Sequence, residues 1–155
     1  MDLITLKKSY AVLEKKYKLP TFSELNAIFE IEKIEQDTDF LARTLRKMMV
    51  DKALNSLAFV EMLIQQMNAP RLYQPFFKTM TQKDQESLQK IYAKLGELSL
   101  ISLSLEVDSN EKKECDAIKK FYETWNDIKS DFSLVLEHIR HPPVPEAKKE
   151  KSYFG

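Results

Sequence analysis

The sequence predicts an all-α protein, folded as an elongated, mostly antiparallel helical bundle with three long helices, one shorter helix and two short helical straps. Three observations lead to this prediction. Apolar residues recur at steps of three and four through most of the chain, which is the spacing of one helix face. The 155 residues include only two glycines. Prolines and helix-capping pairs divide the chain into segments of helical length.

A shorter helix and a strap are predicted near the N-terminus. The shorter helix has one apolar stripe and ends before Pro20, which cannot continue a helix. Thr21 and Glu24 then have the spacing of a capping box, so a short helix starts there. This short helix has more apolar surface than it can hide by itself, and we expect it to pack as a strap across the longer helices. The stripe of the first helix consists of Leu3, Leu6, Tyr10, Leu13 and Tyr17.

A long helix is predicted from about residue 37 to about residue 68, because apolar residues keep helical spacing and neither proline nor glycine interrupts them. Pro70 and Pro75 then break the chain, since each lacks an amide donor and restricts the residue before it. The residues expected to face the core are Leu41, Leu45, Met48, Met49, Leu57, Val60, Ile64 and Met67.

The second long helix begins at another capping pair, Thr81 and Asp84, and runs for about 25 residues. Its last part, LSLISLSLEV, alternates in part as a strand would. A single strand has no partner in this sequence, so we interpret the segment as helix, buried on more than one side. The residues of the whole helix that fit heptad positions are Leu88, Ile91, Leu95, Leu98, Ser102 and Leu105.

The last long helix is predicted to open at Asp108 and Glu111 and to stop at His141, where two prolines follow. Residues 1–140 are therefore expected to form a single bundle domain, and residues 141–155 a flexible tail rich in proline and lysine. The apolar seam of the last helix consists of Ile118, Phe121, Trp125, Ile128, Phe132, Val135 and Ile139.

Composition excludes several classes of protein. The formal net charge is zero, so no overall field attracts the chain to nucleic acid or to an anionic membrane. Two glycines are too few for a P-loop or a dinucleotide-binding fingerprint. Cys115 is the only cysteine, which excludes an internal disulfide and a thiolate zinc site. Neither a secretory signal nor a membrane-spanning stretch is evident, and we expect a cytoplasmic protein with no membrane contact.

No motif in the sequence predicts an enzyme, a cofactor or a metal site. His138 and His141 share a helix face beside Glu137, but a catalytic zinc needs a third ligand in fixed geometry. Cys115 lies at the other end of the same helix, too far away to form a cysteine–histidine pair. A magnesium-dependent nucleotide hydrolase is the enzymatic alternative, because acidic pairs on neighbouring helices can hold magnesium. The pairs are Glu32 with Glu35 and Glu111 with Glu114, the latter followed by Glu123 and Asp127.

Basic and aromatic residues give a nucleic-acid or ribosome-binding alternative. Residues 1–19 and 41–52 are basic and flank the acidic residues 20–40, so the basic segments can either contact phosphates or pair with this acidic strap inside the same molecule. In RLYQPFFK, aromatic residues lie between two basic residues and can stack on bases or close the end of the bundle. The candidate contacts are Arg43, Arg46, Lys47, Arg71, Tyr73, Phe76, Phe77 and Lys78.

The C-terminal tail is the most specific functional signal. Its PPVP stretch favours a semi-rigid polyproline spacer. Beyond it, Tyr153 and Phe154 stand next to Lys151 at the end of the chain. A tethered aromatic pair suits an apolar pocket on another protein. We therefore predict a non-enzymatic adaptor or complex subunit that binds a protein partner, and a homo-oligomer is a further option because a second copy can complete the long apolar seams.

Two segments resemble a known group of proteins. LPTFSELNAIFEIEKI and NAPRLYQPFFK are similar to segments of small, uncharacterised all-helical proteins from archaea. The resemblance implies the same bundle fold and no particular activity.

Overall fold

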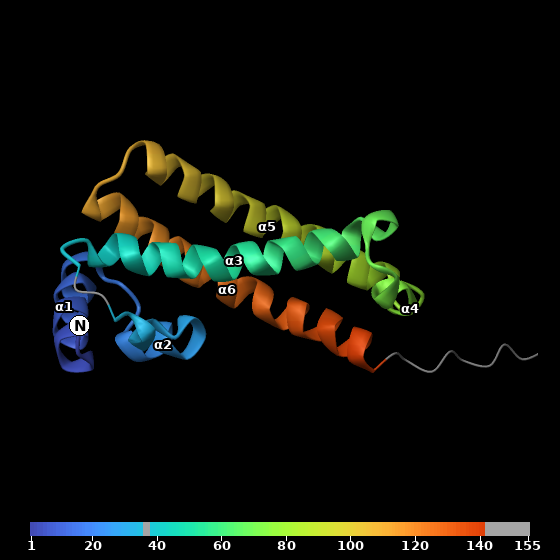
Figure 1. Ribbon diagram of the computed structural model, residues 1–155, viewed down its shortest axis with the longest axis horizontal. Helices are drawn as coiled ribbons and strands as arrows, with labels where there is room; N and C mark the ends of the chain where they lie inside the picture. The colour runs from blue at the N-terminus through green and yellow to red at the C-terminus, as the bar shows by residue number, and fades with distance from the viewer. Residues whose placement is uncertain (36–37, 142–155) are drawn as a thin grey trace, which may run out of the picture.

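The computed structural model describes residues 1–35 and 38–141. Three long helices form its centre (Figure 1): α3 (Leu41–Ile64), α5 (Gln82–Val107) and α6 (Glu111–Arg140). All three contact one another, and α5 runs antiparallel to both α3 and α6. The predicted all-α bundle is confirmed, and none of the described residues belongs to a strand.

Shorter elements cover the ends of the three long helices. At one end lie α1 (Leu3–Tyr17) and α2 (Phe22–Phe29), which contact each other and α3. At the other end lies the short α4 (Gln74–Phe77). The connections contain three single turns of 3₁₀-helix: Ile31–Lys33, Gln66–Asn68 and Arg71–Tyr73.

Side-chain caps mark the starts of four described helices, and the first is Asp2 at α1, which accepts a hydrogen bond from the amide of Thr5. Thr21 and Glu24 form a complete capping box at α2, and Thr81 and Asp84 form another at α5. Both starts are as predicted. The start of α6 differs from the prediction, which placed the capping pair at Asp108 and Glu111. The N-cap residue is Asn110, whose side chain accepts a hydrogen bond from the amide of Lys113.

The third helix is shorter than predicted. It begins at Leu41 and ends at Ile64, after which Gln65 leaves helical geometry. Met67 was expected in the core, but it lies beyond this end in a 3₁₀ turn and is 99% exposed. The expectation was wrong because the apolar spacing continues past the point where the backbone turns.

One core runs through the whole bundle. It extends from Leu6 and Tyr10 on α1 to Val135 and Ile139 on α6. Each residue of the predicted α6 seam is buried except Trp125. Trp125 is partly buried and packs edge-on against Phe29 of α2. Among the described residues, no helix is long and apolar enough to cross a membrane.

Candidate functional site

A buried polar cluster joins the three long helices. At its centre is Arg46 of α3, which is 1% exposed. Its Nε donates to Oε2 of Glu114 on α6 at 2.8 Å, and its Nη1 donates to Oγ of Ser102 on α5 at 2.9 Å. Its Nη2 donates to Oε1 of Glu106, also at 2.9 Å, and Ser109 donates to Oε1 of Glu114 at 2.6 Å. All ends of the guanidinium are thus held inside the molecule.

The electrostatics of the cluster are those of a structural ion pair. Burial acts to raise the pKa of Glu114, but hydrogen bonds from Arg46 and Ser109 outweigh it and hold that pKa below its ordinary value. Glu114 is therefore a carboxylate at neutral pH, paired with a cation. Within the described part of the chain, every buried side-chain nitrogen and oxygen has a hydrogen-bond partner. The cluster joins the three long helices through side chains that are hydrogen-bonded to one another.

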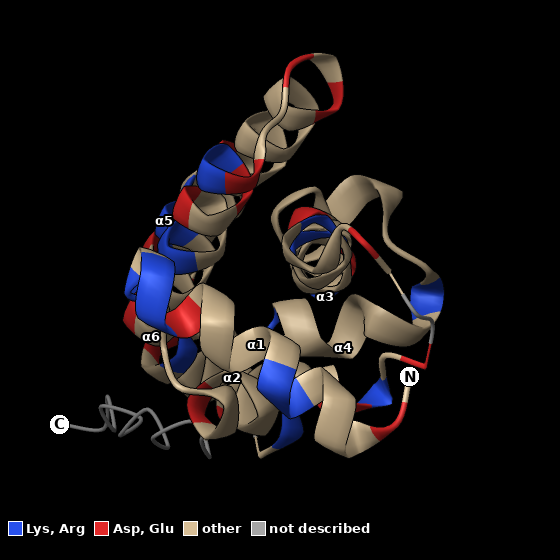
Figure 2. Ribbon diagram, turned by 90° about the vertical axis from the view of Figure 1, so that its left-hand side faces the viewer, with Lys and Arg blue, Asp and Glu red and all other residues tan. Residues whose placement is uncertain are grey.

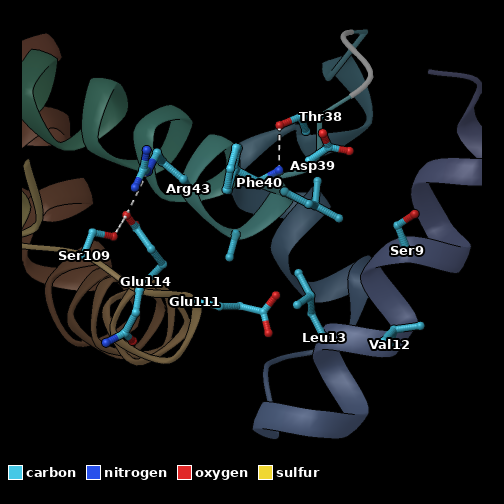
Figure 3. A pocket seen from close by; sticks show the side chains of 13 residues that line it. Ser9, Val12, Leu13, Thr38, Asp39, Phe40, Arg43, Ser109, Glu111 and Glu114 are labelled. Carbon is cyan, nitrogen blue, oxygen red and sulfur yellow. Dashed lines mark hydrogen bonds and ion pairs between the residues drawn. The ribbon is translucent and has the colours of Figure 1, made fainter.

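A cavity of about 520 Å³ lies next to this cluster, between α1 and the first turns of α3 and α6 (Figure 3). Leu13 and Phe40 supply apolar walls, and Arg43, Glu111 and Glu114 supply polar ones. These polar groups are already engaged. Glu111 accepts hydrogen bonds from Lys16 and Tyr17, and Glu114 pairs with Arg46 and, at 3.5 Å, with Nε of Arg43. Arg43, Glu111 and Glu114 are thus engaged within the protein, and Ser9, Thr38 and Asp39 are further polar residues of the lining.

The residues considered for catalysis are held by other parts of the fold. Nδ1 of His138 lies 2.9 Å from Oδ1 of Asp84, the capping residue of α5, so this pair joins the last turns of α6 to the start of α5. Cys115 is completely buried, and burial raises the pKa of its thiol to about 12. No group of three or more His, Cys, Asp or Glu side chains in the described ranges is arranged to hold a metal ion.

Of the basic residues predicted on α3, Arg46 is buried, and the side chains of Arg43 and Lys47 are about half exposed. Arg46 was expected to contact nucleic acid, but it is buried in the polar cluster, and this part of the prediction is wrong. Arg43 pairs with Glu114, and Nζ of Lys47 lies 3.9 Å from Oε2 of Glu106. Acidic and basic residues are interspersed along α5 and α6 (Figure 2). The α3 residues thus pair with Glu106 of α5 and Glu114 of α6, whereas the acidic residues 20–40 were the expected internal partners, and nucleic-acid contact through Arg43 and Lys47 stays a prediction.

The aromatic segment around α4 closes one end of the bundle. Phe76 and Phe77 are partly buried and pack against the core. Tyr73 makes an edge-on contact with Phe76, with ring centroids 6.0 Å apart. Arg71 and Lys78 are exposed beside them. The predicted tail contacts Lys151, Tyr153 and Phe154 lie outside the described residues.

The outward side of α5 carries exposed apolar residues. Leu100 is 68% exposed, Leu103 63% and Val107 89%, and their spacing of three and four places them on one stripe. The prediction that this end of the helix is buried on more than one side was therefore wrong. Leu98, Ser102 and Leu105 are buried, and Ile101 is partly buried against the core. We call the outward stripe the α5 face, and it consists of Tyr92, Ala93, Gly96, Leu100, Leu103 and Val107.

The helix geometry explains how the α5 face arises. Residues 98, 102 and 105 point to α3 and α6, so residues 96, 100, 103 and 107 fall on the opposite side of the same helix. α5 lies at an edge of the bundle in both views (Figures 1 and 2), and the described residues leave Leu100, Leu103 and Val107 largely exposed. A contiguous apolar stripe of this kind marks an interaction site more often than a scattered single exposed residue does.

Known proteins give no parallel for this geometry. No family model matches the chain, and no curated protein or solved structure is significantly similar to it. The resemblance to uncharacterised archaeal proteins stays a prediction. Function must be inferred from the residues themselves.

Proposed function

We propose that this chain is a protein-binding subunit with no catalytic role, and that it binds through the α5 face. The observation that carries the proposal is the exposure of Leu100, Leu103 and Val107 on one stripe. Leaving these side chains in water is unfavourable, and contact with an apolar surface of another protein removes that cost.

The surroundings of the stripe favour a protein over a nucleic acid. The α5 face contains no charged residue, whereas phosphate contacts need lysine or arginine. Arg43, Arg46 and Lys47 are engaged with Glu114 and Glu106. Nucleic-acid binding through Arg71, Tyr73 and Lys78 is the alternative outcome of the test below.

The C-terminal tail is proposed as a second contact. Lys151, Tyr153 and Phe154 follow a proline-rich spacer, and this arrangement suits docking into an apolar pocket of the partner. A cytoplasmic location belongs to the same proposal, since one cysteine in the whole chain is consistent with a reducing compartment.

The test is co-purification with tagged chains from native extract, washed at about 0.1 M and about 1 M salt. The wild type is compared with a Leu100→Lys/Leu103→Lys variant, with a chain that ends at Arg140, and with a matched control. The control is Ile4→Lys/Leu72→Lys, which replaces two exposed apolar residues elsewhere on the surface.

We expect the wild type and the control to retain proteins, including untagged copies of the chain itself, at both salt concentrations. The Leu100→Lys/Leu103→Lys variant should lose them, and the truncated chain should lose only what the tail adds. The proposal is contradicted if that variant retains the same proteins as the wild type. Recovery of RNA that high salt removes from every form would favour the nucleic-acid alternative.

A further inference from the structure

The inference below rests on the protein-binding function just proposed and names the partner. We propose that the α5 face binds a second copy of this chain, with the two α5 helices packed antiparallel about a twofold axis. A contact of this type is isologous, because the same surface on both copies forms it. The surface must then complement itself in shape and in charge.

Gly96 is the first argument for a close contact on this face. It lies in the interior of α5, where glycine is less favourable than alanine. Its backbone does not have positive φ, and a Cβ atom added to it would meet nothing within 4 Å. The single chain therefore gives no steric or conformational reason for glycine here. Close approach by another helix does give one, because the missing side chain lets the two helices approach.

The shape of the face is the second argument. Its N-terminal half carries the small residues Ala93 and Gly96 beside the partly exposed Tyr92, and its C-terminal half carries Leu100, Leu103 and Val107. Antiparallel packing lays the large half of each copy over the small half of the other, so that leucines fill the space above Gly96. Parallel packing would set large residues against large ones and small against small.

Charge is the third argument. Each charged residue that borders the face is held in an ion pair with its own bundle: Lys90 with Asp131, Glu97 with Lys120 and Glu106 with Arg46. Because these bordering charges are already paired, they do not favour a strongly charged partner. A second copy presents the same uncharged stripe with the same paired borders, so neither charge repulsion nor an unpaired buried charge arises.

The available area agrees with a reversible dimer. From the exposed fractions of its large residues, the face offers roughly 500 Å² per copy, and a pair would bury about 1,000 Å². That is near the lower limit for a specific interface.

Sedimentation equilibrium of the full chain over a range of concentrations tests the dimer. We expect a monomer–dimer equilibrium for the wild type and for the Ile4→Lys/Leu72→Lys control. Leu100→Lys/Leu103→Lys should weaken dimerisation about 100-fold or more. Gly96→Ala should weaken it about tenfold. Because nothing in the single chain opposes a methyl group at Gly96, this variant should fold at least as stably as the wild type, so that loss of dimer cannot be attributed to unfolding.

Disulfide formation tests the orientation. Chains carrying Ala93→Cys are mixed with chains carrying Leu103→Cys and oxidised mildly, and the native Cys115 is buried and does not compete. Antiparallel packing predicts that disulfides join an Ala93→Cys chain to a Leu103→Cys chain. Disulfides mainly between two identical chains would overturn the antiparallel arrangement.

Failure of the dimer and failure of the proposed function are distinguishable. If the wild type is monomeric at every concentration, while Leu100→Lys/Leu103→Lys still loses other proteins in co-purification, the partner is a different protein and the self-association is wrong. If this variant changes neither the sedimentation nor the co-purification, the α5 face has no binding role and both proposals fail.

Discussion

Two faces of the same helix, α5, both carry leucines but meet different surroundings. On the inward face, Leu95 and Leu98 are buried against α3 and α6. On the outward face, Leu100 and Leu103 remain largely exposed, and no described residue covers them. The inward leucines stabilise the fold of the single chain. The outward leucines add little to that fold, and contact with another molecule is the role that we propose for them. Leucine content alone does not distinguish these two roles.

The inward face also carries the polar cluster, and breaking this cluster should have the largest effect. Arg46→Ala removes the closest cation from Glu114, whose side chain is 3% exposed, and leaves it Arg43 at 3.5 Å and the hydrogen bond from Ser109. Loss of the main partner of a buried carboxylate is costly, and we expect the free energy of unfolding to fall by up to about 3–5 kcal/mol. Urea unfolding of the variant measures this loss.

A double variant provides the control for Arg46→Ala. Arg46→Met with Glu114→Leu removes both charges, so no unpaired charge stays buried, and most of the lost stability should return. A loss below about 1 kcal/mol for Arg46→Ala itself would show that the cluster does not hold the inward face of α5 in place.

Truncating one leucine on each face of α5 compares the contributions of the two faces to stability directly. Leu98→Ala should lower the free energy of unfolding by about 2–5 kcal/mol, because it leaves a cavity in the core. Leu100→Ala should change it by about 0.5 kcal/mol or less when measured at low protein concentration. Equal losses for the two variants would mean that Leu100 contributes to the fold of the single chain.

The smallest expected effect is on the acid stability of the inward face. The pKa of Glu114 is lowered in the fold despite its burial, because Arg46 and Ser109 donate to it, and burial of Asp84 is likewise outweighed by bonds from Thr81 and His138. A group with a lowered pKa in the folded state stabilises it above the ordinary pKa. The free energy of unfolding should therefore be maximal above pH 4.5, the ordinary value for Glu114, and fall as the pH decreases through the lowered value.

Urea unfolding at a series of pH values measures this dependence. In Glu114→Gln the residue at position 114 can no longer titrate, so its share of the acid-induced loss should disappear. A wild type whose stability stays constant from about pH 7 to about pH 3 would contradict the electrostatic account of the cluster.

Structural elements that depend only on residues close together in the sequence could be predicted from the sequence. The capping boxes at Thr21 and Thr81 need only residues three positions apart, and the α6 seam from Ile118 to Ile139 repeats within one helix. These signals were sufficient for the all-α fold, for the three long helices and for most of the core. They depend on local geometry that each segment carries with it.

The candidate site depends on contacts between distant residues, and the sequence could not predict it. Arg46 finds its partners Ser102 and Glu114 at separations of 56 and 68 residues, so it looked like one of several basic residues on an exposed face. The leucines of α5 fit burial on two sides as well as on one, because helical spacing does not say which neighbours are present. Gly96 was the one available signal for the outward face, as the only glycine inside a predicted helix.

The most direct test of the central claim is the dependence of the thermal unfolding midpoint on protein concentration. If the outward face of α5 binds a second copy, the midpoint of the wild type should rise with concentration, because dimerisation stabilises only the folded state. The midpoint of Leu100→Lys/Leu103→Lys should stay constant over the same range. A midpoint that does not change with concentration in the wild type would contradict the claim.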